Sequence, residues 1–122
     1  MGKKTVIIGA TPDRSRYAYL AAQMLQEYGH DFVPVSIKTG EVFGRQILDL
    51  RQKPAIDDVD TVTMYIGTRN QAEWMDYILS LKPKRIIFNP GTENDAFAGL
   101  AENENIEALE ACTLVMLRTG QY

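Results

Sequence analysis

Residues 5–16 read TVIIGATPDRSR, and this stretch predicts the class of the fold. Its first four residues are all β-branched and show no polar alternation, as in a strand that is buried on both faces of a parallel sheet. Gly9 ends the run and allows a sharp turn. Residues 17–28 then place apolar side chains at the three-and-four spacing of an amphipathic helix, which Gly29 can end. The stretch predicts a buried strand, a tight turn and a helix in direct succession.

The same alternation continues along the chain. Four more segments have the length and composition of strands: residues 32–35, 62–66, 85–88 and 106–109. Two more helices are predicted, one at residues 71–81 and one at residues 94–103, where Asn94 or Asp95 can cap the first turn. Pro34 cannot donate a ladder hydrogen bond, so its strand is predicted to lie at an edge there. Residues 38–60 are polar and turn-rich, and we expect irregular structure with room for one short strand.

Strands that alternate with helices indicate a parallel sheet with right-handed crossovers. The predicted fold class is therefore α/β, a Rossmann-like three-layer α/β/α fold with a mainly parallel sheet of about five strands. At 122 residues and 45% hydrophobic content, the chain fits a single domain over residues 1–122.

Composition and charge indicate the cellular compartment of the protein and its classes of binding partner. The single cysteine, Cys112, cannot form an intramolecular disulfide, and the N-terminal residues lack the layout of a signal peptide. We therefore expect a cytoplasmic protein. The apolar runs are far shorter than the roughly 20 residues of a membrane span, so no membrane contact is expected. A net charge of -3 without a basic stripe indicates no nucleic-acid partner. The sequence leaves open a homodimer or an unknown protein partner.

The loop after the first strand has the chemistry of a phosphate site. In open α/β sheets, ligands bind outside the carboxyl ends of the strands. Backbone N–H groups at the start of the following helix favour an anion there. Thr11 and Ser15 can add hydroxyl donors, and Arg14 or Arg16 can add a guanidinium that suits phosphate oxygens. The simpler interpretation is that Asp13 or Ser15 only caps the helix and that the arginines are solvated.

The details of the loop bear on the kind of nucleotide. Only the first glycine of the G-x-G-x-x-G fingerprint is present, and the Gly-Lys-Ser/Thr ending of a Walker loop is missing. Dinucleotide binders tend to place an acidic residue at the end of the second strand, whereas this chain has Ser36 and Lys38. A lysine suits a ligand with a phosphate on its ribose, such as coenzyme A, better than plain NAD. The alternative is that Lys38 is an exposed surface lysine.

Seven stretches, in order along the chain, share the features of one known family: residues 6–13 (VIIGATPD) with Arg16, residues 25–29 (LQEYG), residues 32–35 (FVPV) with Lys38, residues 44–45 (GR), residues 60–62 (DTV), residues 89–94 (NPGTEN) and Cys112. Together they resemble the stand-alone CoA-binding domain family, which is related to the N-terminal domain of the succinyl-CoA synthetase α subunit. The resemblance covers nearly the whole chain. Two stretches depart from the family pattern: Ser36-Ile37, where Asn-Pro is common, and residues 88–91 at the end of the fourth strand.

The resemblance implies a nucleotide ligand, coenzyme A or an acyl-CoA, at the first strand-turn-helix. It implies that Lys38 and the loop after Ile8 hold the phosphates, and that residues 65–68 lie near the adenine, with Tyr65 the candidate for stacking. With the candidates from the residues themselves, the predicted cofactor-binding set is Gly9, Ala10, Thr11, Arg14, Ser15, Arg16, Ser36, Lys38, Tyr65, Ile66 and Gly67.

Catalysis and metal binding find little support in the sequence. The only histidine, His30, precedes the second strand and so lies at the edge opposite the expected ligand. Cys112 has no second histidine to activate it, and the chain has no cluster with metal-ligand spacing. Glu93 as a general base is a weaker alternative. We predict no catalytic residues and no metal, and a non-catalytic binding module, carrier or sensor. The alternative is an NAD(H)-binding redox sensor or small enzyme on the same fold.

Overall fold

The computed structural model describes residues 2–122 and has a parallel sheet at its centre. The sheet has the order β5-β2-β1-β6-β7-β8, and every neighbouring pair is parallel. Its strands are β1 (Thr5–Ile8), β2 (Phe32–Ser36), β5 (Leu48–Asp49), β6 (Thr61–Met64), β7 (Arg85–Phe88) and β8 (Glu107–Glu110). Five of these strands match predicted ones within two residues, and β5 is the short addition.

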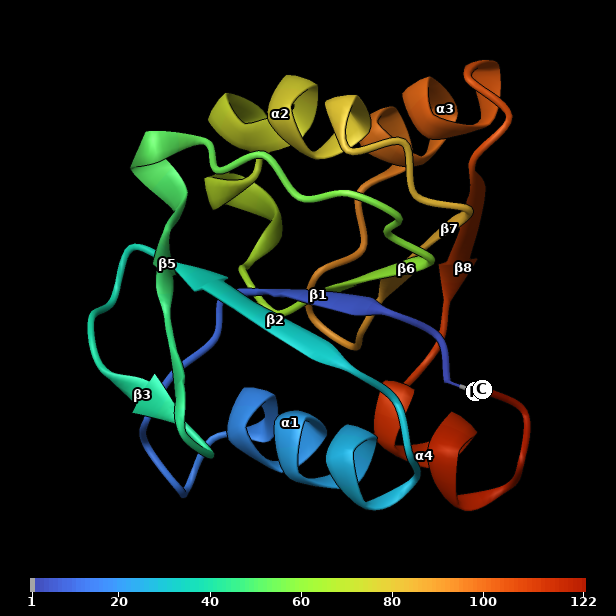
Figure 1. Cartoon of the computed structure of the whole chain (residues 1–122). Helices are drawn as coiled ribbons and strands as arrows, with labels where there is room; N and C mark the ends of the chain where they lie inside the picture. The colour runs from blue at the N-terminus through green and yellow to red at the C-terminus, as the bar shows by residue number, and fades with distance from the viewer. Residues whose placement is uncertain (1) are drawn as a thin grey trace.

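Helices cover both faces of the sheet (Figure 1). One face carries α1 (Tyr17–Glu27) and α4 (Thr113–Arg118), and the other carries α2 (Met75–Ser80) and α3 (Asp95–Asn103). The Rossmann-like three-layer α/β/α prediction is thus confirmed. None of the helices within residues 2–122 is long and apolar enough to cross a bilayer.

The alternation of side chains along β1 explains why Val6, Ile7 and Ile8 are apolar one after another. Val6 and Ile8 pack into the cluster that contains Phe97 of α3, whereas Ile7 points to the opposite cluster with Leu25 of α1. All five of these side chains are fully buried. Because both faces are covered, no polar residue is needed at alternate positions.

The segment expected to be irregular contains more structure than predicted. Before β5, β3 (Glu41–Val42) and β4 (Arg45–Gln46) form an antiparallel two-stranded sheet, and a 3-10 turn, Leu50–Gln52, follows β5. Strands of two residues are too short to show an alternating pattern, so the sequence carries no periodic signal for them.

The outer edge of β2 shows how Pro34 is tolerated. Strand β5 pairs only with Val35 and Ser36, so Pro34 has a neighbouring strand on the β1 side alone, as predicted. Next to it, the Phe32 carbonyl accepts a hydrogen bond from Arg45 Nη1 at 2.9 Å. Arg45 also forms an ion pair with Asp31, with 2.6 Å between Nη1 and Oδ1.

Two helical predictions need correction. In place of the helix expected over residues 71–81, a 3-10 turn, Ala72–Trp74, comes first and α2 begins only at Met75; another 3-10 turn, Thr68–Asn70, precedes Gln71. The reason is Gln71, whose buried side chain bonds to two loops and separates the turns. No helix was expected in residues 113–118, because six residues carry too little periodicity to predict one. The predicted cap of α3 is confirmed, since Asn94 Oδ1 accepts the Phe97 N–H at 3.0 Å.

Candidate functional site

The carboxyl ends of β2, β1 and β6 meet at the point where the strand order reverses. From β1 the chain moves outward to β2, and it later returns to the other side of β1 at β6. Gly9 N donates to Val35 O at 2.9 Å, and Tyr65 N donates to Ile8 O at 2.8 Å. Such a reversal leaves a crevice outside the strand ends, where ligands of open α/β sheets bind.

Gly9 is required by its conformation and its surroundings. Its φ is +98°, a region that other L-residues rarely adopt. A Cβ atom at this position would lie 2.9 Å from both the carbonyl carbon and the oxygen of Tyr65, and 3.0 Å from Cγ2 of Ile66. The glycine therefore lets the loop after β1 lie directly against the loop after β6.

Helix α1 begins without a side-chain cap. Its N-cap residue is Arg16, no side chain accepts a hydrogen bond from the first turn, and the first turn contains no acidic residue. Asp13 Oδ1 instead accepts from the backbone N–H and the hydroxyl of Ser15, at 2.9 and 2.7 Å. The interpretation that Asp13 or Ser15 caps the helix is therefore wrong. Tyr19 N and Leu20 N donate to Arg16 O, so within residues 2–122 the first-turn N–H groups of Tyr17 and Ala18 remain free to bind an anion.

Charged groups collect beside this helix start. Hydrogen bonds from Ser15 lower the pKa of Asp13, and the positive charges of Arg16 and Lys38 lower it further. Arg16 and Lys38 both line the cavity at the crevice, although they belong to loops after different strands. The loop after β1 thus carries an ionised carboxylate beside two cations that come from separate segments.

The cavity at the crevice has a volume of about 410 Å³, within the usual range of ligand sites. The predicted residues that line it are Gly9, Thr11, Arg16, Ser36, Lys38, Tyr65, Ile66 and Gly67. Three predicted residues are not in its wall, because Ala10 is buried in the core below the loop, and Arg14 and Ser15 point to solvent. The structure thus brings most of the predicted set together around one hollow.

The sequence analysis missed several lining residues: Tyr17, Ala18, Ile37, Asn70, Pro90, Gly91 and Thr92. Their place in the fold, rather than their residue type, could have identified them. Each lies in the first turn of α1 or in a loop just beyond the carboxyl end of β2, β6 or β7, and the topology brings these segments to one edge.

Tyr65, the predicted stacking residue, is not freely exposed. It is half-buried, and burial raises the pKa of its phenol. Within the described chain, its buried hydroxyl has no hydrogen-bond partner. The ring separates the cavity at the crevice from a second cavity near Cys112. A ligand in either cavity meets this ring.

Two buried amides hold the loops around the crevice. Gln71 Nε2 donates to Ile66 O at 3.0 Å and to Thr92 O at 2.8 Å, so it joins the loops after β6 and β7. Asn89 Nδ2 donates to Thr63 Oγ1 at 2.7 Å, and Asn89 Oδ1 accepts from Thr113 N at 2.8 Å. These bonds fix the loops relative to the sheet without using the residues that line the cavity with charge.

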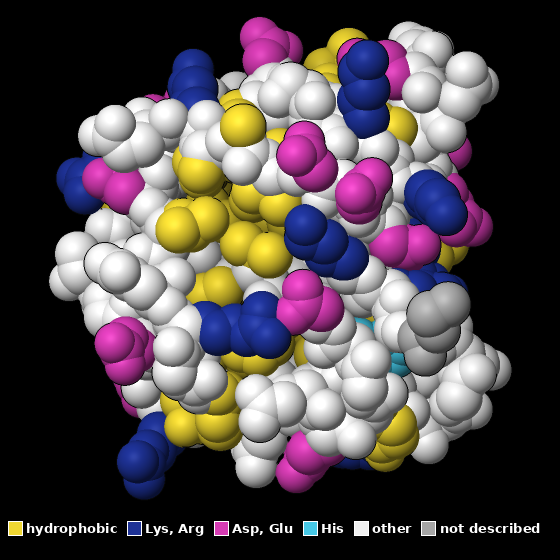
Figure 2. Space-filling view, viewed as in Figure 1, with side chains coloured by type: hydrophobic (Ala, Val, Ile, Leu, Met, Phe, Trp, Pro, Cys, Tyr) yellow, Lys and Arg dark blue, Asp and Glu magenta, His cyan; other side chains and the backbone are white. Residues whose placement is uncertain are grey.

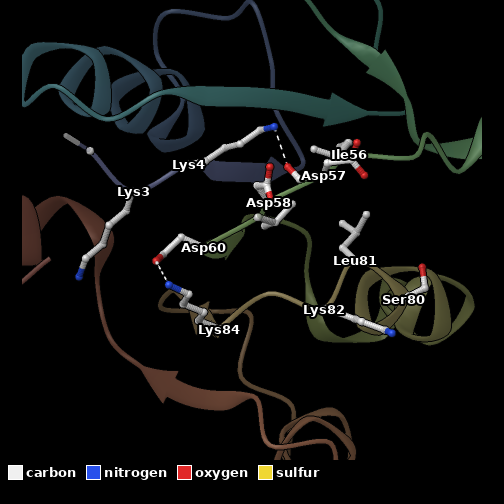
Figure 3. A pocket seen from close by; sticks show the side chains of 12 residues that line it. Lys3, Lys4, Ile56, Asp57, Asp58, Asp60, Ser80, Leu81, Lys82 and Lys84 are labelled. Atoms are coloured by element: carbon white, nitrogen blue, oxygen red, sulfur yellow. Dashed lines mark hydrogen bonds and ion pairs between the residues drawn. The ribbon is translucent and has the colours of Figure 1, made fainter.

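Another cavity, of about 750 Å³, lies at the opposite edge of the sheet (Figure 3). Lysines and aspartates lie around it: Lys4 Nζ donates to the backbone carbonyl of Asp57 at 2.7 Å, and Lys84 Nζ lies 3.9 Å from the Asp60 carboxylate oxygen Oδ2. Four lysines and three aspartates line this cavity, so neither sign of charge dominates there, and no helix of eight or more residues starts there within residues 2–122. His30 lies at the same edge, as predicted, where its Nδ1 accepts the Lys3 N–H at 2.9 Å.

Charges on the surface are mixed. On the face shown in Figure 2, lysine and arginine side chains lie scattered among aspartates and glutamates, with hydrophobic atoms gathered near β5. Within the part of the chain that the structure describes, no three histidine, cysteine, aspartate or glutamate side chains gather as metal ligands do.

The fold and the crevice define a class: a parallel α/β domain with an uncapped helix start at the reversal of its strand order. Within this class, the chain belongs to the CoA-binding domain family, whose sequence profile matches residues 3–118. The family resemblance stated from the sequence is thereby confirmed.

Solved structures show the same fold. An uncharacterized protein is 52% identical, with a TM-score of 0.96, and the match covers 100% of this chain and 99% of that one. A hypothetical protein from Pyrococcus horikoshii OT3 is 23% identical, with a TM-score of 0.84, over 97% of this chain and 83% of that one. RSP, a Rex-family repressor solved in complex with β-NAD+ and operator DNA, is 17% identical, with a TM-score of 0.59, over 99% of this chain and 56% of that one. No curated protein matches the sequence.

Proposed function

We propose that this chain binds coenzyme A or an acyl-CoA at the crevice and acts as a non-catalytic binding module, carrier or sensor. One observation carries the proposal: the uncapped start of α1 opens onto a cavity that also contains Arg16 and Lys38. Free N–H groups, a helix dipole and two cations together favour a ligand with several phosphates. Membership of the CoA-binding domain family supports coenzyme A as that ligand.

The residues have separate parts in this proposal. The diphosphate binds to the first-turn N–H groups of α1, with the Arg16 guanidinium beside it. Thr11 Oγ1 already accepts the Asp13 N–H at 3.1 Å, so its hydroxyl hydrogen is free to donate to the ligand. Lys38 binds the 3′-phosphate of the ribose. In the proposal, residues 1–122 act as one domain in the cytoplasm.

NAD(H) is the second candidate. The Rex-family repressor RSP has the same fold over about half of its length and was solved with β-NAD+. Against this candidate stands the end of β2, where Ser36 is buried and its Oγ accepts the Lys38 N–H at 3.1 Å. No carboxylate follows β2 at the position that usually binds the ribose hydroxyls of NAD.

Thermal unfolding with four ligands tests the proposal: coenzyme A, 3′-dephospho-coenzyme A, NAD and ATP. A ligand present at a hundred times its Kd stabilises the folded state by about 2.7 kcal/mol, which raises Tm by roughly 10 °C for a chain of this size. We expect the largest shift with coenzyme A and a smaller one with the dephospho form. A shift with NAD and none with coenzyme A would contradict the proposal.

Paired variants test the part played by Lys38. Lys38→Gln should reduce the coenzyme A shift to that of the dephospho form, because the 3′-phosphate loses its cation. Lys82→Gln, which removes a lysine at the opposite edge of the sheet, is the matched control and should leave the shift unchanged. Equal shifts for the two ligands in the wild-type protein would remove the part assigned to Lys38.

A further inference from the structure

A second cavity adjoins the proposed coenzyme A site. It has a volume of about 360 Å³ and lies between the starts of α1 and α4. Tyr17, Tyr65 and Pro90 line both cavities, so the two hollows share a boundary. A ligand that extends from the helix start past Tyr65 reaches the second cavity directly.

The walls of the second cavity are mainly apolar. Leu20 of α1 faces Leu114 and Val115 of α4 across it. Tyr17 is 71% exposed and Val115 is 49% exposed, so large hydrophobic side chains stand in water at this point of the surface. Arg118 is the one charged lining residue among those described, and its side chain is exposed to solvent. An apolar group that covers walls of this kind removes apolar surface from water, which favours binding.

A third cavity, on the opposite side of the crevice, indicates which end of the ligand lies on which side. This cavity of about 410 Å³ shares Ser36 and Ile66 with the proposed coenzyme A site and is lined by Trp74 and Leu50. It lies on the β2 side, where Lys38 is placed for the ribose phosphate. The nucleoside end of the ligand therefore extends toward Trp74, and the thioester end extends toward α4.

We propose that the cavity between α1 and α4 binds the acyl chain of an acyl-CoA, and that the ligand is a thioester with a short, uncharged, apolar acyl group. This inference rests on the proposed function, because the pantetheine arm of a coenzyme A bound at the helix start would run past Tyr65 and carry the thioester into the cavity. A volume of 360 Å³ lies near the lower end of the range for ligand sites, which suits a chain of few carbons. A dicarboxylic acyl group would bury a carboxylate against leucine and valine, at a cost that a solvated Arg118 does not offset.

Calorimetric titration of the wild-type protein with coenzyme A and its acetyl, butyryl and succinyl thioesters tests this inference. Each methylene that leaves water for the cavity should lower Kd about fourfold, so butyryl-CoA should bind about fifteenfold more tightly than acetyl-CoA. Succinyl-CoA should bind no more tightly than acetyl-CoA. Equal Kd values for acetyl-CoA and butyryl-CoA, or tightest binding of succinyl-CoA, would overturn the inference and leave coenzyme A binding in place. If neither coenzyme A nor any thioester binds, the proposed function fails and this inference fails with it.

Two variants locate the acyl chain. Val115→Asp puts a carboxylate on the cavity wall, and we expect the ratio of the acetyl-CoA and butyryl-CoA Kd values to fall from about fifteen to about one. Leu100→Asp is the matched control, because Leu100 is 43% exposed on α3 at the other face of the sheet. That variant should keep the wild-type ratio. An unchanged ratio in Val115→Asp would place the acyl chain elsewhere and overturn the inference, and the wild-type titrations stand even if this variant does not fold.

Discussion

Replacing Gly9 with alanine tests whether the approach of the β1 and β6 loops depends on a missing side chain. Gly9 has a φ of +98°, and an added Cβ would lie 2.9 Å from the carbonyl carbon and oxygen of Tyr65. Those atoms are backbone, so no change of rotamer relieves the contact. The end of β6 has to move away from β1 to admit the methyl group.

The expected loss of stability has two parts. A positive φ costs a non-glycine residue about 1–2 kcal/mol, and forcing a methyl group into a packed position costs about 1–3 kcal/mol. Alanine also reduces the conformational freedom of the unfolded chain, which stabilises the folded state by about 0.4–1 kcal/mol and offsets part of the loss. The free energy of unfolding should therefore fall by about 2–4 kcal/mol, and Tm by roughly 8–16 °C at about 4 °C per kcal/mol.

Urea unfolding followed by circular dichroism measures this loss, and Gly44→Ala is the matched control. Gly44 also has a positive φ, +78°, but no atom lies within 4 Å of its added Cβ. This control should therefore lose only the conformational part, about 1 kcal/mol. If Gly9→Ala is no more destabilising than Gly44→Ala, the contact with Tyr65 is not what requires glycine, and the reasoning is refuted.

Three further changes have expected outcomes. Burial, and then the charge of Lys3, lowers the pKa of His30 in the folded protein, so on acidification the imidazole is protonated more readily in the unfolded chain and the free energy of unfolding should fall as pH drops below about 6.5. Urea titrations at pH 7.5 and 5.5 should show a smaller fall in His30→Asn than in the wild-type protein. An equal fall in the two proteins would contradict the assignment to His30. Asn94→Ala removes the acceptor of the Phe97 N–H and should cost about 1 kcal/mol in chemical denaturation, whereas an unchanged midpoint would show that the cap is dispensable. Asn89→Ala leaves the buried N–H of residue 113 without its acceptor and should cost about 1–3 kcal/mol; amide hydrogen exchange at that N–H should accelerate, and unaltered exchange would count against the bond.

The parts of the fold that sequence analysis predicted are those with a repeating pattern. The β-branched run of residues 5–8 and the helical spacing after Tyr17 both extend over enough residues to distinguish a strand from a helix. The β3–β4 pair has two residues in each strand, and α4 has six residues, so each contains too few periods of its pattern to distinguish a strand or a helix from a loop. The interruption at Gln71 has another cause, because it depends on loops that lie far from Gln71 in the sequence.

The candidate site also contains residues that the sequence predicts and residues that it does not. Arg16 and Lys38 were predicted because each follows a recognisable strand, and parallel strands end at one edge. The role of Asp13 could not be predicted, because a carboxylate near a helix start serves equally well as a cap or in a turn with Ser15. The residues at positions 90–92 depend on the strand order, which places the loop after β7 beside the crevice. Sequence spacing alone does not contain that order.

The arrangement at the outer edge of β2 bears on how two copies of this chain could associate. An uncovered edge strand offers unpaired backbone groups to another strand and invites edge-to-edge aggregation. The Asp31 and Val35 carbonyls face β1, so by strand alternation the backbone groups of Phe32 and Pro34 face outward. Pro34 has no N–H to offer there, and the Phe32 carbonyl is already bonded to Arg45.

The opposite edge of the sheet is protected by charge. Strand β8 begins and ends with exposed glutamates, Glu107 and Glu110, which would repel a second β8 laid alongside. The part of β2 that β5 leaves uncovered and the outer strand β8 therefore both disfavour pairing with a strand of a second molecule. We therefore expect a homodimer of this chain to use its helices or loops rather than β2 or β8.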